Sequence, residues 1–293
     1  MKRILTLLTL VLAATALQAA PKKLLVVTTT TGFRHSSIST LEKVIAQLGK
    51  DSGAFTVDFI HQPSGNQPGK LQKDATDAQK AAFTNAVEAW NGKMKSALQK
   101  LSPESLKNYD GVVFASTTGQ LPIPDPQGLL DWIKAGHAFI GIHAASDTFH
   151  QWPEYMAMLG GELAHHGPQL SVECLNEDPV HPATAHLGKT WTLQQEEMYQ
   201  FKNYDSAKVH DLLILDKQPE KPFTPGHFPV SWCKPFGGGK VFYTSLGHRE
   251  DIIDADPDLK NRKNSPEISK AYQAHVLGGI QWALGLKTSK PLP

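Results

Sequence analysis

The chain has 293 residues, of which 40% are hydrophobic and 19% charged, with 29 Lys and Arg against 28 Asp and Glu. A formal net charge of +1 provides neither a basic surface nor an acidic tail, so we expect no nucleic-acid partner. The two cysteines, Cys174 and Cys233, lack Cys-x-x-Cys and zinc-finger spacing. They allow at most one disulfide, and the sequence leaves open whether they pair.

The start of the chain has the pattern of a secretory signal peptide. A charged beginning precedes an apolar run at 4–17, and Ala19 and Ala20 provide small residues for cleavage. We therefore expect a signal peptide at residues 1–20, a mature domain at residues 21–293 and a periplasmic or secreted location. A retained N-terminal anchor is the alternative. Later apolar runs fall short of the roughly 20 residues that span a bilayer, so we expect no stable membrane association after processing.

The first half of the mature chain alternates between strands and helices. Short apolar runs rich in β-branched residues predict buried strands, and apolar residues at steps of three or four predict helices. These patterns predict strands at 24–27, 55–60, 111–115 and 138–142, and helices at 37–49 and 126–135. Strands that alternate with helices imply right-handed βαβ units, and hence an α/β fold with a mainly parallel sheet.

Residues 62–108 interrupt this alternation. A polar loop precedes apolar residues at helical spacing over 75–101, which predicts a long amphipathic helix whose simplest explanation is packing. The second half is predicted to contain a helix at 153–159, strands at 170–175, 212–215, 229–233 and 240–245, and a closing helix at 269–284. Gly237-Gly-Gly239 predicts a hairpin turn before the last strand.

Polar side chains follow four of the predicted strands. The segments are Thr28 to His35, Ser116 to Gly119, His143 to Asp147 and Gly247 to Glu250. Ligands of a doubly wound sheet bind outside the carboxyl ends of its strands, so these segments are the first candidates for a site. They would bring together three histidines, an aspartate, a glutamate and several hydroxyl groups. Nucleotide-binding glycine fingerprints do not follow the first strand.

Gly141-Ile-His-Ala-Ala145 has the shape of a nucleophile elbow, a sharp turn from a strand into a helix. Histidine stands where a nucleophilic Ser or Cys would be needed, so His143 suits acid/base work or metal binding instead. A zinc centre with ligands drawn from His35, His143, His165 and His248 and a carboxylate is chemically reasonable, because catalytic zinc takes three protein ligands and keeps one position open. Acid/base catalysis without a metal is the alternative.

Seven motifs, in order along the mature chain, resemble the ThuA-like family, which is named for trehalose utilisation. They are Thr31-Gly-Phe-Arg-His-Ser-Ser-Ile38, Thr117-Thr-Gly119, Gly141-Ile-His-Ala-Ala-Ser-Asp-Thr148, Leu159-Gly-Gly161, Asp178-Pro-Val-His-Pro-Ala-Thr184, Glu196-Glu-Met-Tyr199 and Phe242-Tyr-Thr-Ser-Leu-Gly-His-Arg-Glu250. The resemblance implies a flavodoxin-like, class I glutamine amidotransferase-like three-layer sandwich. It also implies a link to disaccharide catabolism through oxidised keto-sugars.

The resemblance further implies which side chains share a cleft: His35, His143, Asp147, His165, Glu197, Tyr199 and His248. We expect His143 and His248 to act as acid/base groups or metal ligands, with Asp147 or Glu197 as the carboxylate partner. The candidates for substrate binding are His35, Arg34, Thr118, His165, Tyr199 and Glu250. On the residues alone, the adjacent Glu196 and Glu197 are equally compatible with a solvated edge.

These expectations combine into one function with two alternatives. The sequence predicts an exported protein that binds a small-molecule sugar, a trehalose-like disaccharide or a keto-sugar, and acts on it as a hydrolase or lyase. The alternatives are a non-catalytic sugar-binding module and an amidotransferase-like scaffold that lacks the Cys nucleophile and is no functional glutamine amidotransferase. The long helix belongs to an insertion at about residues 70–105, which is either a lid or a packed addition. The sequence leaves open whether the protein forms a homo-oligomer.

Overall fold

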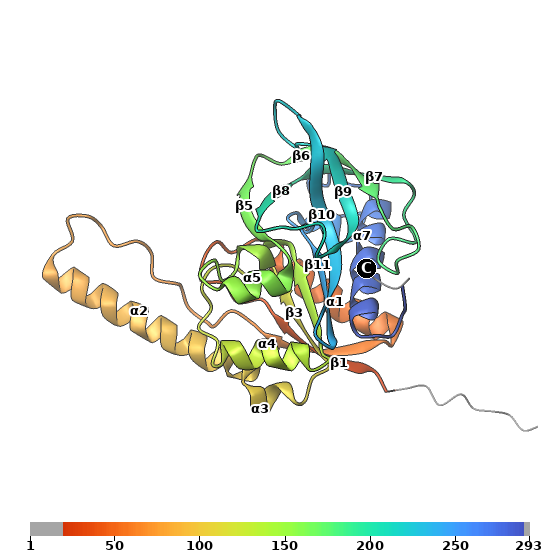
Figure 1. Ribbon diagram of the computed structural model, residues 1–293. Helices are drawn as coiled ribbons and strands as arrows, with labels where there is room; N and C mark the ends of the chain where they lie inside the picture. The colour runs from red at the N-terminus through yellow and green to blue at the C-terminus, as the bar shows by residue number, and fades with distance from the viewer. Residues whose placement is uncertain (1–19, 290–293) are drawn as a thin grey trace, which may run out of the picture.

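The computed structural model describes residues 20–289, so the predicted signal peptide, apart from its last residue, lies outside the described residues. A nine-stranded sheet crosses the molecule, and helices cover both of its faces (Figure 1). The strand order is β2 (Phe55–Ile60), β1 (Lys22–Val27), β3 (Gly111–Ala115), β4 (Ala138–Ile142), β11 (Gly239–Thr244), β10 (Pro225–Phe236), β9 (His210–Lys217), β6 (Leu170–Asn176) and β7 (Thr190–Glu196). A separate two-stranded sheet pairs β5 (Glu162–His166) with β8 (Tyr199–Lys202).

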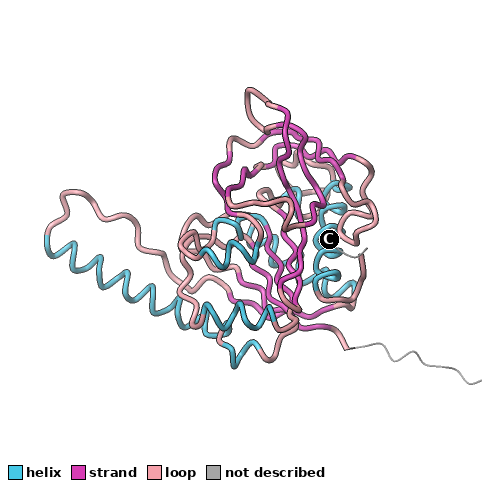
Figure 2. Tube along the Cα trace, viewed as in Figure 1, coloured by secondary structure: helices cyan, strands magenta, loops and turns pink. Residues whose placement is uncertain are grey.

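The helices fall into two layers, which Figure 2 shows in cyan on either side of the magenta strands. One layer contains α1 (Ile38–Ser52), α6 (Glu250–Ile253) and α7 (Pro266–Ala283). The other contains α2 (Asp77–Leu98), η1 (Gln99–Leu101), α3 (Pro103–Leu106), α4 (Pro126–Lys134) and α5 (Pro153–Leu159). A short 3₁₀ helix, η2 (His143–Asp147), follows β4 directly. None of the described helices is long and apolar enough to cross a membrane.

Five neighbouring strands, β2, β1, β3, β4 and β11, form an all-parallel half of the sheet. Their order corresponds to the 2-1-3-4-5 order of flavodoxin-like folds. The predicted α/β fold is thus confirmed, and its parallel strands lie where the apolar runs placed them. The other four strands, β10, β9, β6 and β7, continue the sheet with antiparallel pairing.

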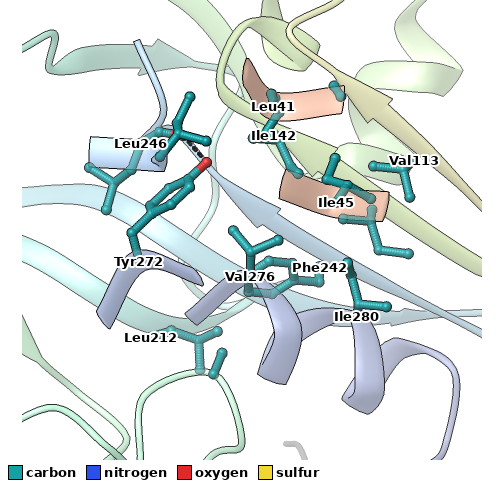
Figure 3. Close-up of a cluster of buried hydrophobic side chains, with 14 of the residues drawn as sticks. Leu41, Ile45, Val113, Ile142, Leu212, Phe242, Leu246, Tyr272, Val276 and Ile280 are labelled. Carbon is teal, nitrogen blue, oxygen red and sulfur yellow. Dashed lines mark hydrogen bonds between the residues drawn. The ribbon is translucent and has the colours of Figure 1, made fainter. Parts of the chain in front are cut away.

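Successive residues of the parallel strands enter opposite layers because side chains alternate along a strand. Leu24 and Val26 of β1 belong to the core beneath α1 and α7, whereas Leu25 and Val27 belong to the core on the other face. Figure 3 shows the first core, in which side chains from helices and strands meet: Leu41 and Ile45 of α1, Val276 and Ile280 of α7, Val113, Ile142 and Phe242. Burial on both faces explains the continuous apolar runs in the sequence.

The predicted long helix is confirmed as α2, which extends away from the body of the molecule (Figure 1). A capping box fixes its start, since Thr76 and Gln79 bond reciprocally through side chain and backbone. Its buried residues are Trp90, Met94 and Leu98, all in the C-terminal half. Packing therefore explains the second half of the helix, and the first half projects into solvent.

The predicted hairpin turn and the predicted closing helix are both present, and the two cysteines do not form a disulfide. Phe236 pairs with Gly239 across the predicted hairpin turn, where Gly237 has a φ of 62° that suits glycine. The closing helix is present as α7. Cys174 and Cys233 are both fully buried and unpaired, one in β6 and the other in β10.

Candidate functional site

Four side chains converge at the carboxyl ends of the parallel strands. His35 follows β1, His143 follows β4, His248 follows β11, and Glu197 lies between β7 and β8. Each offers one nitrogen or oxygen atom that can bind a metal ion, and these four atoms lie within 4.8 Å of one another. We refer to these residues as the histidine–glutamate cluster.

His143 is held in a strained elbow at the end of β4. Its φ is 51°, a region that residues with a Cβ seldom adopt. The hydroxyl of Tyr243 donates to the His143 carbonyl at 2.8 Å, and the Ser245 carbonyl lies 2.7 Å from His143 Nδ1. Because a carbonyl can only accept, Nδ1 carries the proton and Nε2 keeps its lone pair. This arrangement is the usual way in which a protein orients a metal-binding histidine.

The free nitrogen of His143 faces the rest of the cluster. Its Nε2 lies 3.2 Å from Nε2 of His35, 3.1 Å from the Tyr199 hydroxyl and 3.7 Å from Oε2 of Glu197. Burial lowers the pKa of His35 to about 4, with a further contribution from His248, and lowers the pKa of His143 well below its usual value. The Nε2 atoms of His35 and His143 are 3.2 Å apart, so they can either form a hydrogen bond through one proton or bind one cation together.

Glu197 supplies the negative charge of the cluster. Its Oε2 lies 3.2 Å from Nδ1 of His248, and its Oε1 lies 3.0 Å from Nδ1 of His166. Burial by itself would raise the pKa of Glu197, but the contact with His248 and the neighbouring histidines lower it. Burial by itself would lower the pKa of His248, but Glu197 raises it. An ionised carboxylate therefore lies among the imidazole rings.

The spacing of these atoms fits a divalent metal ion. Ligand atoms about 2.0–2.1 Å from a tetrahedral zinc ion lie roughly 3.3 Å from one another. The separations are 3.2 Å between His35 and His143, 3.2 Å between Glu197 and His248, and 3.7 Å between His143 and Glu197. Three imidazoles and one carboxylate also suit other first-row divalent ions.

Glu196 fixes the loop that carries His248. Its Oε1 accepts hydrogen bonds from the backbone N–H groups of Gly247, at 3.0 Å, and His248, at 2.8 Å. The carboxyl group is fully buried, and burial raises its pKa to about 7. Of the two adjacent glutamates, Glu197 thus belongs to the cluster and Glu196 positions the backbone beneath it.

Several predicted residues lie outside the cluster. Asp147 contacts His150 at 2.7 Å, and Glu162 contacts the other side of the same ring at 2.6 Å. Arg34 donates to the Thr28 carbonyl, Thr118 donates to the Phe33 carbonyl, and Glu250 accepts from Ser36. These bonds shape the loops around the cluster, while Tyr199 contacts it directly.

The position of His165 corrects one expectation. His165 was a candidate metal ligand and substrate residue, but its side chain is exposed and contacts Glu220 at 3.4 Å. Its neighbour His166 reaches Glu197 instead. The two residues are consecutive in β5, at an irregularity in its pairing with β8, and of the two rings that of His166 reaches Glu197. Sequence reasoning also missed His150 and Glu162, which carry no motif that would mark them.

Comparisons with known proteins agree with this architecture. The profile of the ThuA family, described as trehalose utilisation, matches residues 23–283. A solved ThuA-like protein from Parabacteroides merdae is 18% identical, with a TM-score of 0.63 and 93% of each chain covered. Another, from Bacteroides uniformis, is 19% identical, with a TM-score of 0.58 and 90% of this chain and 92% of that chain covered. Both share the fold, and a search of curated proteins gave no match.

Proposed function

Because the chain belongs to the ThuA family of trehalose utilisation, we propose that it is an exported carbohydrate-active enzyme whose histidine–glutamate cluster binds a divalent metal ion. Its substrate would be a trehalose-like disaccharide or a keto-sugar, and its reaction hydrolysis or elimination. Membership of the family supports a sugar as the substrate. The charged start and apolar run within residues 1–20 support export to the periplasm or beyond.

The convergence of four ligand atoms within 4.8 Å carries this proposal. An ion held there would polarise a sugar oxygen or lower the pKa of a bound water. The chain's own groups are arranged to support such chemistry. His143 presents a lone pair because Ser245 fixes its other nitrogen, and Glu197 provides compensating charge. The hydroxyl of Tyr199, 3.1 Å from His143, stays protonated because burial raises its pKa, so it can donate to a sugar oxygen.

The elbow gives no support to amidotransferase chemistry. His143 occupies the position of the nucleophile, and the sulfur atoms of Cys174 and Cys233 are buried in strands of the antiparallel half. A metal-free reaction has one observation in its favour. His248, whose pKa Glu197 raises, could exchange protons with a substrate as a general acid. Metal content therefore separates the two mechanisms.

The first experiment is elemental mass spectrometry on tag-free protein before and after chelation. We expect about one divalent ion per chain in the wild type and almost none in His143→Ala. His165→Ala is the matched control, because this exposed histidine lies outside the cluster, and it should keep the ion. Wild-type protein that takes up no stoichiometric ion, even when zinc or manganese is supplied, would overturn the metal proposal.

Turnover tests the enzymatic half of the proposal. Wild-type protein should release a monosaccharide from keto-trehalose, and His143→Ala should lose the activity together with the ion. Protein that binds sugars and metal without any turnover would instead be a binding module, which would refute the proposed catalysis.

A further inference from the structure

An uncharged groove lies beside the loops that carry the cluster. It has a volume of about 370 Å³, at the lower end of the roughly 300–1,000 Å³ typical of small-molecule sites. One wall is the middle of α2, and the other is formed by the loops that follow β1, β2 and β3. Its side chains include Thr31, Gln67, Val87, Trp90, Asn91 and Gln120. None of the eight described residues that line it carries a charge.

The groove occupies the place where this fold class binds ligands. From β1 the chain runs to α1 in one helical layer, and from the adjacent β3 it runs to α4 in the other layer. Loops that leave neighbouring strands in opposite directions open a crevice, and ligands of doubly wound sheets bind there. The backbone N–H of Thr31 donates to the Thr118 carbonyl at 3.0 Å, which joins the two loops.

One of these loops carries a residue of the histidine–glutamate cluster, and the other is bonded to the 3₁₀ helix that begins with His143. Thr31 lies four residues before His35 in the loop after β1. The backbone N–H of Gly119 donates at 2.9 Å to the carbonyl of Asp147, at the end of the 3₁₀ helix that begins with His143. A ligand that fills the groove would therefore lie next to the elements that position two of the cluster's histidines.

The chemistry of the groove matches a sugar ring. Trp90 is 6% exposed, and its indole N–H has no hydrogen-bond partner within the described part of the chain. Buried donors are normally paired, and a ligand in the groove would offer this one an acceptor. Gln67, Asn91 and Gln120 bring amide groups, which both donate and accept hydrogen bonds as sugar hydroxyls do. An indole beside neutral amides suits a ring with an apolar face and a polar edge.

We propose that this groove, which we call the insertion groove, binds one ring of a neutral disaccharide while the other ring reaches the histidine–glutamate cluster. The inference rests on the proposed function and adds a specificity determinant to it. Trp90 and Asn91 lie in α2, so the insertion at about residues 70–105 is the part of the chain that completes the subsite. It would favour two-ring over one-ring substrates.

Titration calorimetry with trehalose tests the inference on the full mature chain. Trp90→Phe removes the N–H group but keeps an aromatic ring in the core, and Asn91→Ala removes one amide from an exposed helix position. Each variant should bind trehalose about 5- to 10-fold more weakly, the effect of roughly one hydrogen bond. Asn85→Ala, an exposed position on the same helix outside the groove, is the control and should bind as the wild type does.

Two further readouts separate this inference from the proposed function. Metal content should be unchanged in Trp90→Phe and Asn91→Ala, and trehalose should change the tryptophan emission of the wild type but not that of Trp90→Phe. If the wild type binds metal and turns over keto-trehalose while both variants bind trehalose normally, the groove inference alone fails. If the wild type binds no sugar at all, both proposals fail.

Discussion

At the scale of single residues, the backbone at His143 shows how the fold directs one side chain. A φ of 51° costs on the order of 1–3 kcal/mol for a residue with a Cβ, and such strain concentrates at functional sites. Ser116, which follows β3 as His143 follows β4, has a φ of 52°. In His143 the hydrogen bonds from Tyr243 and to Ser245 hold the strained conformation, so that one imidazole nitrogen faces the cluster.

The adjacent histidines of β5 give a matched pair of variants at this scale. His166→Ala removes the side chain that contacts Glu197 at 3.0 Å, and should weaken zinc affinity about 10-fold, as expected when a group that orients a metal ligand is lost. His165→Ala removes an exposed contact with Glu220 and should leave the affinity unchanged. Competition with a chelating dye measures both. Equal affinities in the two variants would contradict the assignment of His166.

At the scale of elements, the helices α7 and α2 differ in how closely their backbones are packed. An ideal Cβ at Gly278 of α7 would lie 2.0 Å from the carbonyl oxygen of Pro182, whereas a Cβ at Gly92 of α2 meets no atom within 4 Å. The backbone of α7 thus contacts a neighbouring segment directly at Gly278, and α2 is open to solvent at Gly92.

This contrast predicts opposite effects for the same substitution. Gly278→Ala should lower the free energy of unfolding by about 1–3 kcal/mol, because the added methyl group cannot fit against Pro182 without moving the helix. Gly92→Ala should raise it by about 0.5–1 kcal/mol, because alanine favours a helix where nothing obstructs it. Urea unfolding followed by circular dichroism measures both. A loss of stability in Gly92→Ala would show that this side of α2 is covered in solution.

At the scale of the whole molecule, buried histidines make the fold sensitive to acid. Burial lowers the pKa of His275 to about 3 and that of His181 to about 4, whereas both titrate near 6.5 in the unfolded chain. Between pH 6.5 and 4 the unfolded state therefore binds more protons, and stability falls as the pH falls. Nearby His186 adds to the effect at His275, and Asp178 opposes it at His181.

His275→Phe tests this origin of acid sensitivity. The phenyl ring would take the place of an imidazole packed against Phe242 and Trp191, and would remove one titrating group. The loss of the bond to the Ala183 carbonyl lowers stability equally at every pH, so the slope is the informative quantity. Between pH 7 and pH 5 the variant should lose up to about 2 kcal/mol less than the wild type. Parallel stability curves from thermal unfolding of chelated protein would contradict this explanation.

The sequence predicted most of the parallel half and three of the four cluster residues for the same physical reason. Strands buried on both faces leave continuous apolar runs such as 111–115, and the strand-end rule then selects His35, His143 and His248. The strands β5 and β8 were missed because they are short and only partly buried, which gives weak local patterns. The alternating burial of β7 is an ordinary strand pattern that the sequence analysis did not use.

The role of Glu197 could not be derived from its own surroundings in the sequence. Two adjacent glutamates are typical of a solvated edge, and only the tertiary fold brings this one beneath three histidines. The local sequence likewise could not distinguish His165 from His166. Alternation along a strand indicates that at most one of two adjacent side chains faces a site, but it does not show which one, and β5 pairs irregularly with β8 at this point.

The four donor atoms of the cluster come from residues 35, 143, 197 and 248, and the last follows the final strand of the sheet. No early segment of the chain can therefore assemble the site during synthesis. If the chain is exported and binds an ion as proposed, loading would have to wait until β11 has docked, after translocation. Affinities of nitrogen and oxygen sites for divalent ions rise from manganese to copper and fall again at zinc. The compartment in which folding finishes, rather than the one in which the chain is made, would then decide which ion the protein carries.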